Sequence, residues 1–242
     1  MATKFIDHLM KYRRTIGVIL VLVGLGFLAI RPYQQHMMKS LDNEVKTELK
    51  SLTPESVKEA DENTDASYDY SAVSAVSLDS ILAAKNSEAK VPMIGEIAIP
   101  DIGLNLPIVK GVTNENLLYG AATMKPNQKM GVGNYSLASH YSDAYDETLL
   151  FAPLIRSQAG MKIYITDMEK IYTYTITSVT LVDPSAVEVL DETGENIITL
   201  VTCNDLSATM RRIVRGKLTN ITTVNNASED VKNAFQAEFK TY

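Results

Sequence analysis

The chain has 242 residues, and 45% of them are hydrophobic, which is enough for one globular domain with additional segments. The formal net charge of -6, from 23 basic and 29 acidic residues, argues against a nucleic-acid-binding protein, which usually carries a basic face. The single cysteine, Cys203, excludes an intramolecular disulfide. A lone cysteine is either a small buried apolar side chain or a reactive thiol, and composition leaves both readings open.

An uncharged run near the N-terminus, residues 15–30, reads TIGVILVLVGLGFLAI. As a helix it would span roughly 24 Å, which is short for a hydrocarbon core of about 30 Å unless Arg14 and Arg31 snorkel at its ends. The basic residues before the run predict a cytoplasmic N-terminus by the positive-inside rule. We therefore expect a cytoplasmic tail over 1–14, a transmembrane signal-anchor over 15–31 and an exported remainder. A cleaved signal peptide is the alternative.

Residues 32–90 differ in composition from both neighbours. From position 34 to 90 there is no glycine and one proline, Pro54. Apolar residues at helical spacing predict a helix over 37–52, and Thr53 before Pro54 suits the cap of a second helix. We expect this region to be an extracellular stalk that holds a domain away from the bilayer. A regulatory arm that covers the active site is the alternative.

From position 91 onward, short β-like runs are bounded by Gly, Pro, Asn and Asp. The runs lie at 93–99, 106–109, 134–139, 161–166, 171–182, 197–203 and 212–221. Residues 167–170 predict a hairpin turn, residues 148–158 a short helix, and residues 225–242 a polar tail. Seven or eight short strands over about 130 residues are typical of a barrel or a sandwich. The scarcity of helical stretches between them argues against alternating parallel βα units.

Three residues of this part could perform chemistry together. His140 is the only histidine after His36, and Cys203 follows it by 63 residues; each ends a β-like run, where catalytic groups often lie. A thiolate is the nucleophilic form of cysteine, and the permanently charged Arg211 could stabilise it or a developing oxyanion. His140 could protonate a leaving amine. Taken alone, the same three residues also fit a buried thiol, a surface histidine and a solvated arginine.

The residues around Cys203 are more specific. The run TLVTC at 199–203 resembles the TLxTC signature of sortases, the transpeptidases of Gram-positive bacteria. Other stretches resemble the histidine segment, the arginine strand and the first two strands of that family: LASH at 137–140, RRIVRG at 211–216, GEIAIP at 95–100 and LPIV at 106–109. The resemblance covers residues 91–224 and is nearest to class A, the housekeeping type, which has an N-terminal anchor.

The resemblance implies a mainly β fold, a closed eight-stranded β-barrel with short helices over 91–224. It also implies a two-step acyl transfer. Cys203 would attack the Thr–Gly bond of an LPxTG-type sorting signal on a surface protein, and an amine of lipid II or of the peptidoglycan cross-bridge would resolve the thioacyl-enzyme. His140 would act first as general acid and then as general base. Arg211 would bind the substrate backbone and the oxyanion.

Further residues receive roles from the same resemblance. Thr202 would supply a hydroxyl or backbone donor at the oxyanion. Arg211 is preferred over Arg212 because it lies five residues before Gly216 and because strand alternation turns Arg212 to the opposite face. The Leu-Pro part of the signal would be gripped by apolar residues, for which core packing is the alternative role: Val187, Val189, Leu190, Ala138, Met124 and Val201.

No metal and no other cofactor is predicted. Some class A members bind calcium, and four acidic residues are candidates by position, although acidic loop residues are usually only solvated: Glu115, Glu188, Asp191 and Glu192. Two further functions stay open at this point. One is a hydrolytic cysteine endopeptidase that uses the same residues, and the other is a non-catalytic β-barrel binding module tethered to the membrane.

Overall fold

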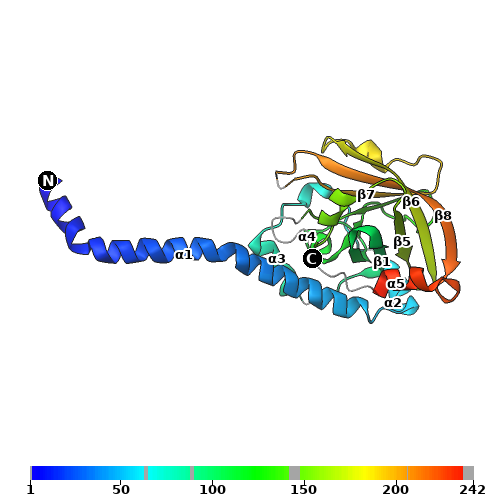
Figure 1. The fold of residues 1–242 in the computed structure, drawn as a ribbon, viewed down its shortest axis with the longest axis horizontal. Helices are drawn as coiled ribbons and strands as arrows, with labels where there is room; N and C mark the ends of the chain where they lie inside the picture. Colours follow the sequence, from blue (N-terminus) through cyan, green and yellow to red (C-terminus); the bar gives the residue numbers. More distant parts are fainter. Residues whose placement is uncertain (1, 63–64, 88–89, 142–147, 206, 237–242) are drawn as a thin grey trace.

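The computed structural model describes residues 2–62, 65–87, 90–141, 148–205 and 207–236, with side chains from Tyr12 onward. The helices are α1 (Ala2–Leu49), α2 (Pro54–Asp61), α3 (Leu78–Lys85), α4 (Asn114–Tyr119) and α5 (Glu229–Gln236). Short 3-10 turns are η1 (Tyr70–Ala72), η2 (Pro100–Ile102), η3 (Ala152–Arg156), η4 (Val187–Leu190) and η5 (Val224–Asn226). The strands are β1 (Met93–Ile99), β2 (Leu104–Val109), β3 (Ala121–Thr123), β4 (Asn134–Ala138), β5 (Lys162–Thr166), β6 (Lys170–Val182), β7 (Ile197–Cys203) and β8 (Arg211–Thr223). A long helix thus leads into a β-domain flanked by short helices (Figure 1).

The described strands close into a barrel in the order β1-β2-β3-β4-β7-β8-β6-β5, and β5 pairs again with β1. Neighbouring strands are antiparallel except for the pairs β2–β3 and β4–β7, which are parallel. Apolar side chains from around the barrel are fully buried at its centre, among them Ile97, Leu137, Ile163, Leu200 and Val214. The structure therefore confirms the predicted closed eight-stranded barrel with short helices.

Most predicted strands appear within one or two residues of their predicted ends. The turn predicted at 167–170 is present: Asp167 Oδ1 accepts hydrogen bonds from the backbone N–H groups of Glu169, at 3.0 Å, and Lys170, at 2.6 Å. Strand β3 was not predicted because it is only three residues long. The helix predicted at 148–158 is shorter and is the 3-10 turn η3. The C-terminal part forms α5, while residues 237–242 lie outside the described residues.

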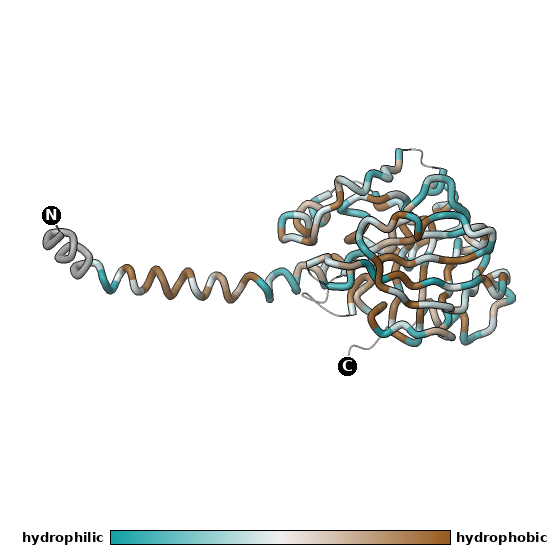
Figure 2. The backbone as a smooth tube through the Cα atoms, turned by 90° about the horizontal axis from the view of Figure 1, so that it is seen from above, coloured by the Kyte–Doolittle hydropathy of each residue, from teal (hydrophilic) through white to brown (hydrophobic). Residues whose placement is uncertain are grey.

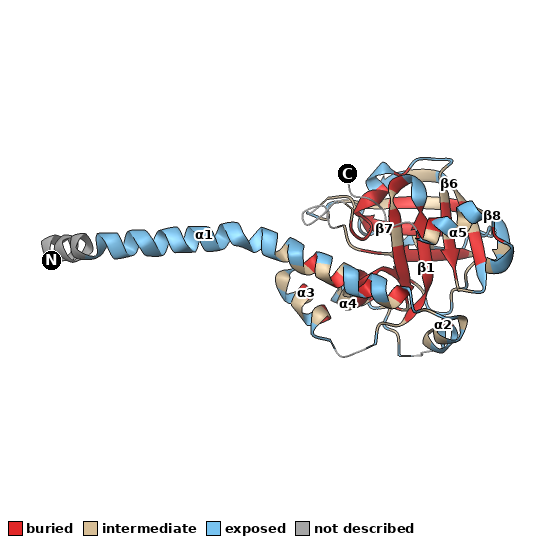
Figure 3. Ribbon diagram, turned by 60° about the horizontal axis from the view of Figure 1, so that its bottom comes forward, coloured by how far each residue is buried: buried red, intermediate tan, exposed pale blue. Residues whose placement is uncertain are grey.

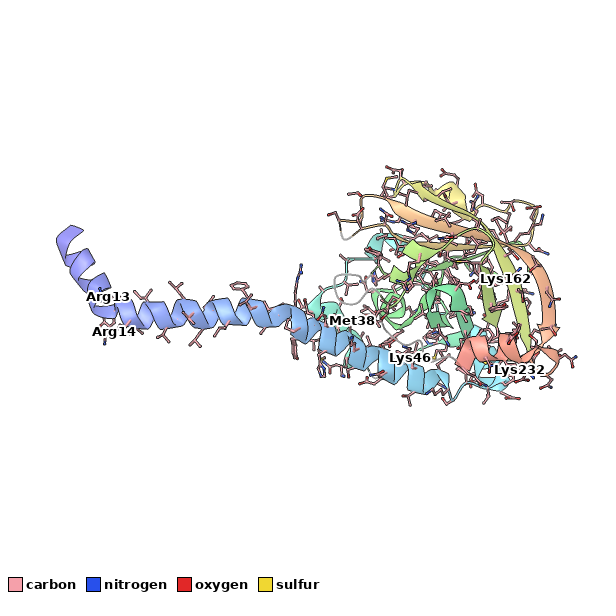
Figure 4. The ribbon with its side chains drawn as sticks, in the orientation of Figure 1. Arg13, Arg14, Met38, Lys46, Lys162 and Lys232 are labelled. Atoms are coloured by element: carbon pink, nitrogen blue, oxygen red, sulfur yellow. The ribbon has the colours of Figure 1, made fainter. Side chains whose placement is uncertain are left out.

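Helix α1 has two halves with different surroundings. In the N-terminal half, apolar side chains are exposed, for example Phe27 at 70% and Leu28 at 76%. Figure 2 shows this half as mainly hydrophobic, and Figure 3 shows that it projects away from the barrel. Arg13 and Arg14 lie towards its free end (Figure 4). Among the described residues, this is the one helix long and apolar enough to cross a membrane, which is consistent with an N-terminal anchor.

The C-terminal half of α1 belongs to the core of the domain. Met38, Leu41, Val45 and Leu49 follow each other at intervals of three or four residues, so they share one face of the helix, and each is 2% to 9% exposed. Met38 lies near the point where the helix reaches the β-domain (Figure 4). The first part of the expected stalk therefore packs on the barrel. The proposed division of the chain after residues 14, 31, 90 and 224 stays a prediction.

The segment between α1 and β1 packs in the same way. The Thr53 hydroxyl accepts a hydrogen bond from Ser56 N at 3.2 Å, which confirms the predicted cap of α2. Val57 of α2 and Ile81 of α3 are both buried. The Tyr119 hydroxyl of α4 donates to the Ala84 carbonyl in the last turn of α3 at 2.8 Å. These contacts hold the N-terminal helices against one side of the barrel.

Candidate active site

The register of two parallel strands brings His140 and Cys203 together. In the β4–β7 pair Ala138 lies opposite Val201, an offset of 201 − 138 = 63 residues. His140 and Cys203 are separated by the same offset, and the Ser139 N–H continues the ladder with a 3.3 Å hydrogen bond to the Val201 carbonyl. Adjacent strands lie about 4.8 Å apart, so both side chains leave neighbouring chains at one level and on one face.

Arg211 joins this pair from the third strand. β7 and β8 are antiparallel, and their register places Arg211 directly opposite Cys203. The Arg211 guanidinium donates to the Ala208 carbonyl at 2.9 Å, which fixes the side chain near the start of β8. Arg212 instead lies opposite Thr202 and donates to Asn204 Oδ1 at 2.8 Å. Arg211 therefore pairs with Cys203 and Arg212 with Thr202, while the role expected for Arg211 stays a prediction.

All three side chains line one groove with a volume of about 320 Å³. The groove lies outside the barrel wall formed by β4, β7 and β8, and the η4 segment forms one of its sides. Every site residue named from the sequence lines it: Cys203, His140, Arg211, Thr202, Val187, Val189, Leu190, Ala138, Met124 and Val201. The structure therefore places these residues together, while their individual roles stay predictions.

Two polar side chains, the buried Asn134 and the partly buried Arg215, hold the η4 segment at the groove. Asn134, at the start of β4, donates from Nδ2 to the carbonyls of Val189 and Asp191, both at 3.0 Å. The Arg215 guanidinium donates to the same Val189 carbonyl at 2.9 Å. Because Arg215 follows Arg211 by four residues on β8, both side chains lie on the groove face of the strand. The apolar side of the groove is thus fastened to the barrel wall.

Glu192 completes this attachment. Lys125 Nζ lies 2.6 Å from Glu192 Oε1, and the backbone N–H of Asn134 donates to Oε2 at 2.8 Å. The hydrogen bond from Lys125 and that from Asn134 lower the pKa of Glu192. Four acidic residues were considered as calcium ligands: Glu115, Glu188, Asp191 and Glu192. Within the part of the chain that the structure describes, no three His, Cys, Asp or Glu side chains form a group that could hold a metal ion.

Burial sets the protonation of His140 and Cys203. It lowers the pKa of His140 to about 4. Burial also raises the pKa of the Cys203 thiol, and the positive charge of Arg211 offsets this only in part, while Asp205 raises the pKa further. The resting site at neutral pH therefore holds a thiol beside a neutral imidazole. The thiolate–imidazolium form is a minor population.

The Thr202 hydroxyl does not point at the groove. It is buried and donates to the Ser139 carbonyl at 2.9 Å. This hydrogen bond ties the residue before Cys203 to the residue before His140. The side chain is thus suited to holding the ends of β4 and β7 at a fixed spacing. The hydroxyl is already used, so the backbone N–H of Thr202 is left for the oxyanion role expected from the sequence.

Sequence reasoning missed part of the groove lining. Tyr70 and Val73 come from the segment between α2 and α3, which was expected to be a stalk, and Leu117 comes from the unpredicted helix α4. Ile213 was also missed, although its place two residues after Arg211 puts it on the same strand face. The alternation signal could have found Ile213. No local pattern marks Tyr70 or Val73 as groove residues.

The comparisons with known proteins agree with this geometry. The family described as "Sortase domain" matches residues 97–219, which contain His140, Cys203 and Arg211. Sortase A of Streptococcus agalactiae serotype III (strain NEM316) is 41% identical over 231 residues, which cover 94% of this chain and 92% of that protein. Sortase A of Listeria monocytogenes serovar 1/2a (strain ATCC BAA-679 / EGD-e) is 35% identical over 202 residues, which cover 84% of this chain and 89% of that protein.

The solved structures lead to the same family. The crystal structure of Listeria monocytogenes sortase A matches with a TM-score of 0.56 at 38% identity, and the match covers 60% of this chain and 99% of that chain. Both the sequence and the fold comparisons thus extend over the barrel that carries the groove. This chain therefore belongs to the sortase family, the transpeptidases of cell-wall sorting.

Proposed function

We propose that this sortase is a cysteine transpeptidase of the class A type. It cleaves an LPxTG-type sorting signal between threonine and glycine and transfers the acyl part to an amine of lipid II or of the peptidoglycan cross-bridge. One observation carries the proposal: Cys203, His140 and Arg211 reach one groove from three adjacent strands at the same level. A thiol, a proton donor and a fixed cation at one place are the parts that acyl transfer needs.

The first half-reaction forms the acyl-enzyme. The Cys203 thiolate attacks the threonine carbonyl carbon, and the resulting oxyanion is stabilised by the Arg211 guanidinium. When the C–N bond breaks, His140 gives its proton to the leaving glycine amine. The products are a thioester on Cys203, a free amine and a neutral imidazole.

The second half-reaction reverses these roles. His140 takes a proton from the incoming amine as the amine attacks the thioester carbonyl. The new amide bond forms and the thiolate of Cys203 leaves, which restores the thiolate–imidazolium pair. Water in place of the amine would give hydrolysis. The ratio of transfer product to hydrolysis product therefore separates a transpeptidase from an endopeptidase that uses the same site.

The groove supplies apolar contacts for the signal. Val187, Val189 and Leu190 from the η4 segment line the groove together with Ala138 and Val201, and Val189 and Leu190 pack against the cluster that contains Val201. These side chains are apolar and carry no polar groups that need hydrogen-bond partners. They can therefore cover the apolar side chains of a leucine and a proline in a substrate. We assign the Leu-Pro part of the signal to this side of the groove.

The topology follows from α1. We place residues 15–31 in the cell membrane, with 1–14 in the cytoplasm and the barrel outside. The exposed apolar side chains of the projecting half-helix support this placement. Both proposed substrates start at the outer face of the same membrane. An anchored enzyme would therefore encounter them by diffusion in the plane of that membrane.

The proposed reaction uses no metal cofactor. The Lys125 ammonium forms a salt bridge with Glu192, so the Glu192 carboxylate already has a cationic partner. We expect equal transfer rates in calcium and in a calcium chelator. A rate that rises severalfold on adding calcium would contradict this part of the proposal.

The test uses the full-length chain in detergent micelles with an LPxTG peptide and triglycine. We expect a thioacyl adduct on Cys203 by mass spectrometry and a transfer product that Cys203→Ala abolishes. His140→Ala should lose a factor of about 10² to 10⁴ in kcat/KM. His36→Ala, an exposed histidine of α1, is the matched control and should retain activity. No adduct on Cys203, or full activity of Cys203→Ala, would refute the proposal.

A further inference from the structure

Part of the groove lining comes from a segment that is far in sequence from the strands carrying Cys203 and Arg211. The segment between α2 and α3, residues 65–77, contains η1 and is called the arm here. It contributes Tyr70 and Val73 to the groove that holds Cys203. The expected role of this region was that of a spacer, so its place beside the catalytic thiol has to be explained.

Hydrogen bonds fasten the arm to the barrel at both ends. Near its start, the Val112 N–H donates to the Ser67 carbonyl at 2.6 Å. Near its end, the Ser74 N–H donates to Asn114 Oδ1 at 2.8 Å, and Asn114 Nδ2 donates to the Ala72 carbonyl at 3.2 Å. Asn114 is the first residue of α4, so one side chain pairs with the arm as both donor and acceptor.

The barrel surface has a matching site for the arm at Gly111. A Cβ atom placed on Gly111 would lie 2.9 Å from both Ala66 Cβ and the Ser67 carbonyl oxygen, closer than side chains tolerate. Gly111 also has φ +83, which favours glycine. The arm thus lies so close to the backbone at position 111 that only glycine fits there without a shift of the arm.

Two arm side chains face the groove. Val73 packs against the buried cluster of Val112, Leu117 and Ala122, on which Ala138 of β4 also packs. The Tyr70 hydroxyl donates to the Met124 carbonyl, which fixes the end of the side chain. The residue is nevertheless 42% exposed, so part of its surface is left for a ligand.

The arm borders the groove without filling it. With the arm in place the groove keeps a volume of about 320 Å³, and Cys203, His140 and Arg211 still line that space. Tyr70 and Val73 of the arm and the largely exposed Val187 of η4 all line this groove. A bound peptide could therefore contact both segments.

We propose that the arm is a wall of the substrate groove and that Tyr70 and Val73 are substrate-binding residues for the apolar part of the sorting signal. This inference rests on the proposed function, because it names a further part of the same site. The tyrosine ring offers a flat, preorganised surface to the leucine or proline side chain. Fixing the ring before substrate arrives lowers the ordering cost of binding.

The test compares Tyr70→Ala, Tyr70→Phe and the control Tyr68→Ala in the full-length chain. Tyr68 lies on the same arm but outside the groove lining that the structure describes. We expect Tyr70→Ala to raise KM for an LPxTG peptide about tenfold, with kcat within about twofold. Tyr70→Phe keeps the ring and loses the hydroxyl, so KM should rise less, about threefold. Tyr68→Ala should match wild type.

Two results would overturn the proposal that the arm is a wall of the substrate groove. An unchanged KM in both Tyr70 variants would show that the arm makes no substrate contact. A rise in kcat/KM for Tyr70→Ala would show that the arm obstructs the groove and must move aside.

A second readout separates this inference from the proposed function. Alkylation of Cys203 by iodoacetamide is measured with and without the LPxTG peptide, and the peptide should protect wild type more than Tyr70→Ala. If wild type transfers the peptide and both Tyr70 variants are protected as well as wild type, only the wall is wrong. If wild type neither transfers the peptide nor is protected by it, the proposed function fails and the wall fails with it.

Discussion

Asn134 connects the barrel wall to the η4 segment that lines the groove. It is 1% exposed; its Nδ2 donates to the Val189 and Asp191 carbonyls at 3.0 Å, and its Oδ1 accepts from the Thr199 hydroxyl at 2.7 Å. With about 1 kcal/mol of net stabilisation per hydrogen bond, Asn134→Ala should lower the free energy of unfolding by about 3 kcal/mol. Because Val189 lines the groove, the freed segment should also bind the signal less well. A loss of about 1.4 kcal/mol in binding raises KM about tenfold.

The assay is urea unfolding of the full-length chain in micelles, followed by far-UV circular dichroism, together with KM for an LPxTG peptide. Asn220→Ala, on the exposed face of β8, is the control and should stay within about 0.5 kcal/mol of wild type. A decrease of less than about 1 kcal/mol for Asn134→Ala would refute the energetic reasoning. A full decrease in stability with a wild-type KM would show that the position of η4 does not govern binding.

Between the low pKa of His140 and the raised pKa of Cys203, the fraction of enzyme that carries both imidazolium and thiolate is constant. The pH profile of kcat/KM should therefore be level from about pH 5 to about pH 8, and a narrow bell inside that range would contradict the protonation argument. Burial raises the pKa of Glu96 to about 7, from an ordinary value of 4.5. The folded state thus holds the proton more tightly, and stability should fall by on the order of 3 kcal/mol as the pH rises from about 4.5 through about 7. Urea unfolding at pH 5 and pH 8 measures this, and Glu96→Gln should remove most of the difference; an equal slope in the variant would point to other groups. Thr202→Val removes the hydrogen bond to Ser139, so kcat should fall about fivefold with little change in KM, while Thr202→Ser should restore it. A wild-type kcat in Thr202→Val would show that this bond does not hold the catalytic strand ends.

The strands that carry Cys203 and Arg211 could be predicted because their signals are local. A short β-like run at 197–203 marked β7, and the spacing of 63 residues between His140 and Cys203 turned out to be the register offset of β4 and β7. The sequence contained that number, but only the pairing of the two parallel strands gives it a meaning in space. A residue count alone does not say which strands are neighbours.

The arm and the η4 segment could not be predicted in place because long-range contacts position them. Ser67 pairs with Val112, and Val189 with Asn134, across 45 and 55 residues of chain. Neither segment carries a hydrophobic period that identifies its partner. The continuation of α1 into the core escaped prediction for a related reason: the apolar run and the amphipathic face that follows it are two patterns in one helix.

The continuity of α1 constrains where the enzyme can work. Residues 15–31, placed in the bilayer above, and Met38 in the barrel core belong to a single helix, Ala2–Leu49. Pro32 removes one helical hydrogen bond near the junction, which allows some bending but no free rotation. The groove should therefore keep a nearly constant distance from the lipid surface and a nearly constant orientation relative to it. Acceptor amines farther from the membrane must then move to the groove, because a continuous helix and not a flexible linker joins the groove to the proposed membrane segment.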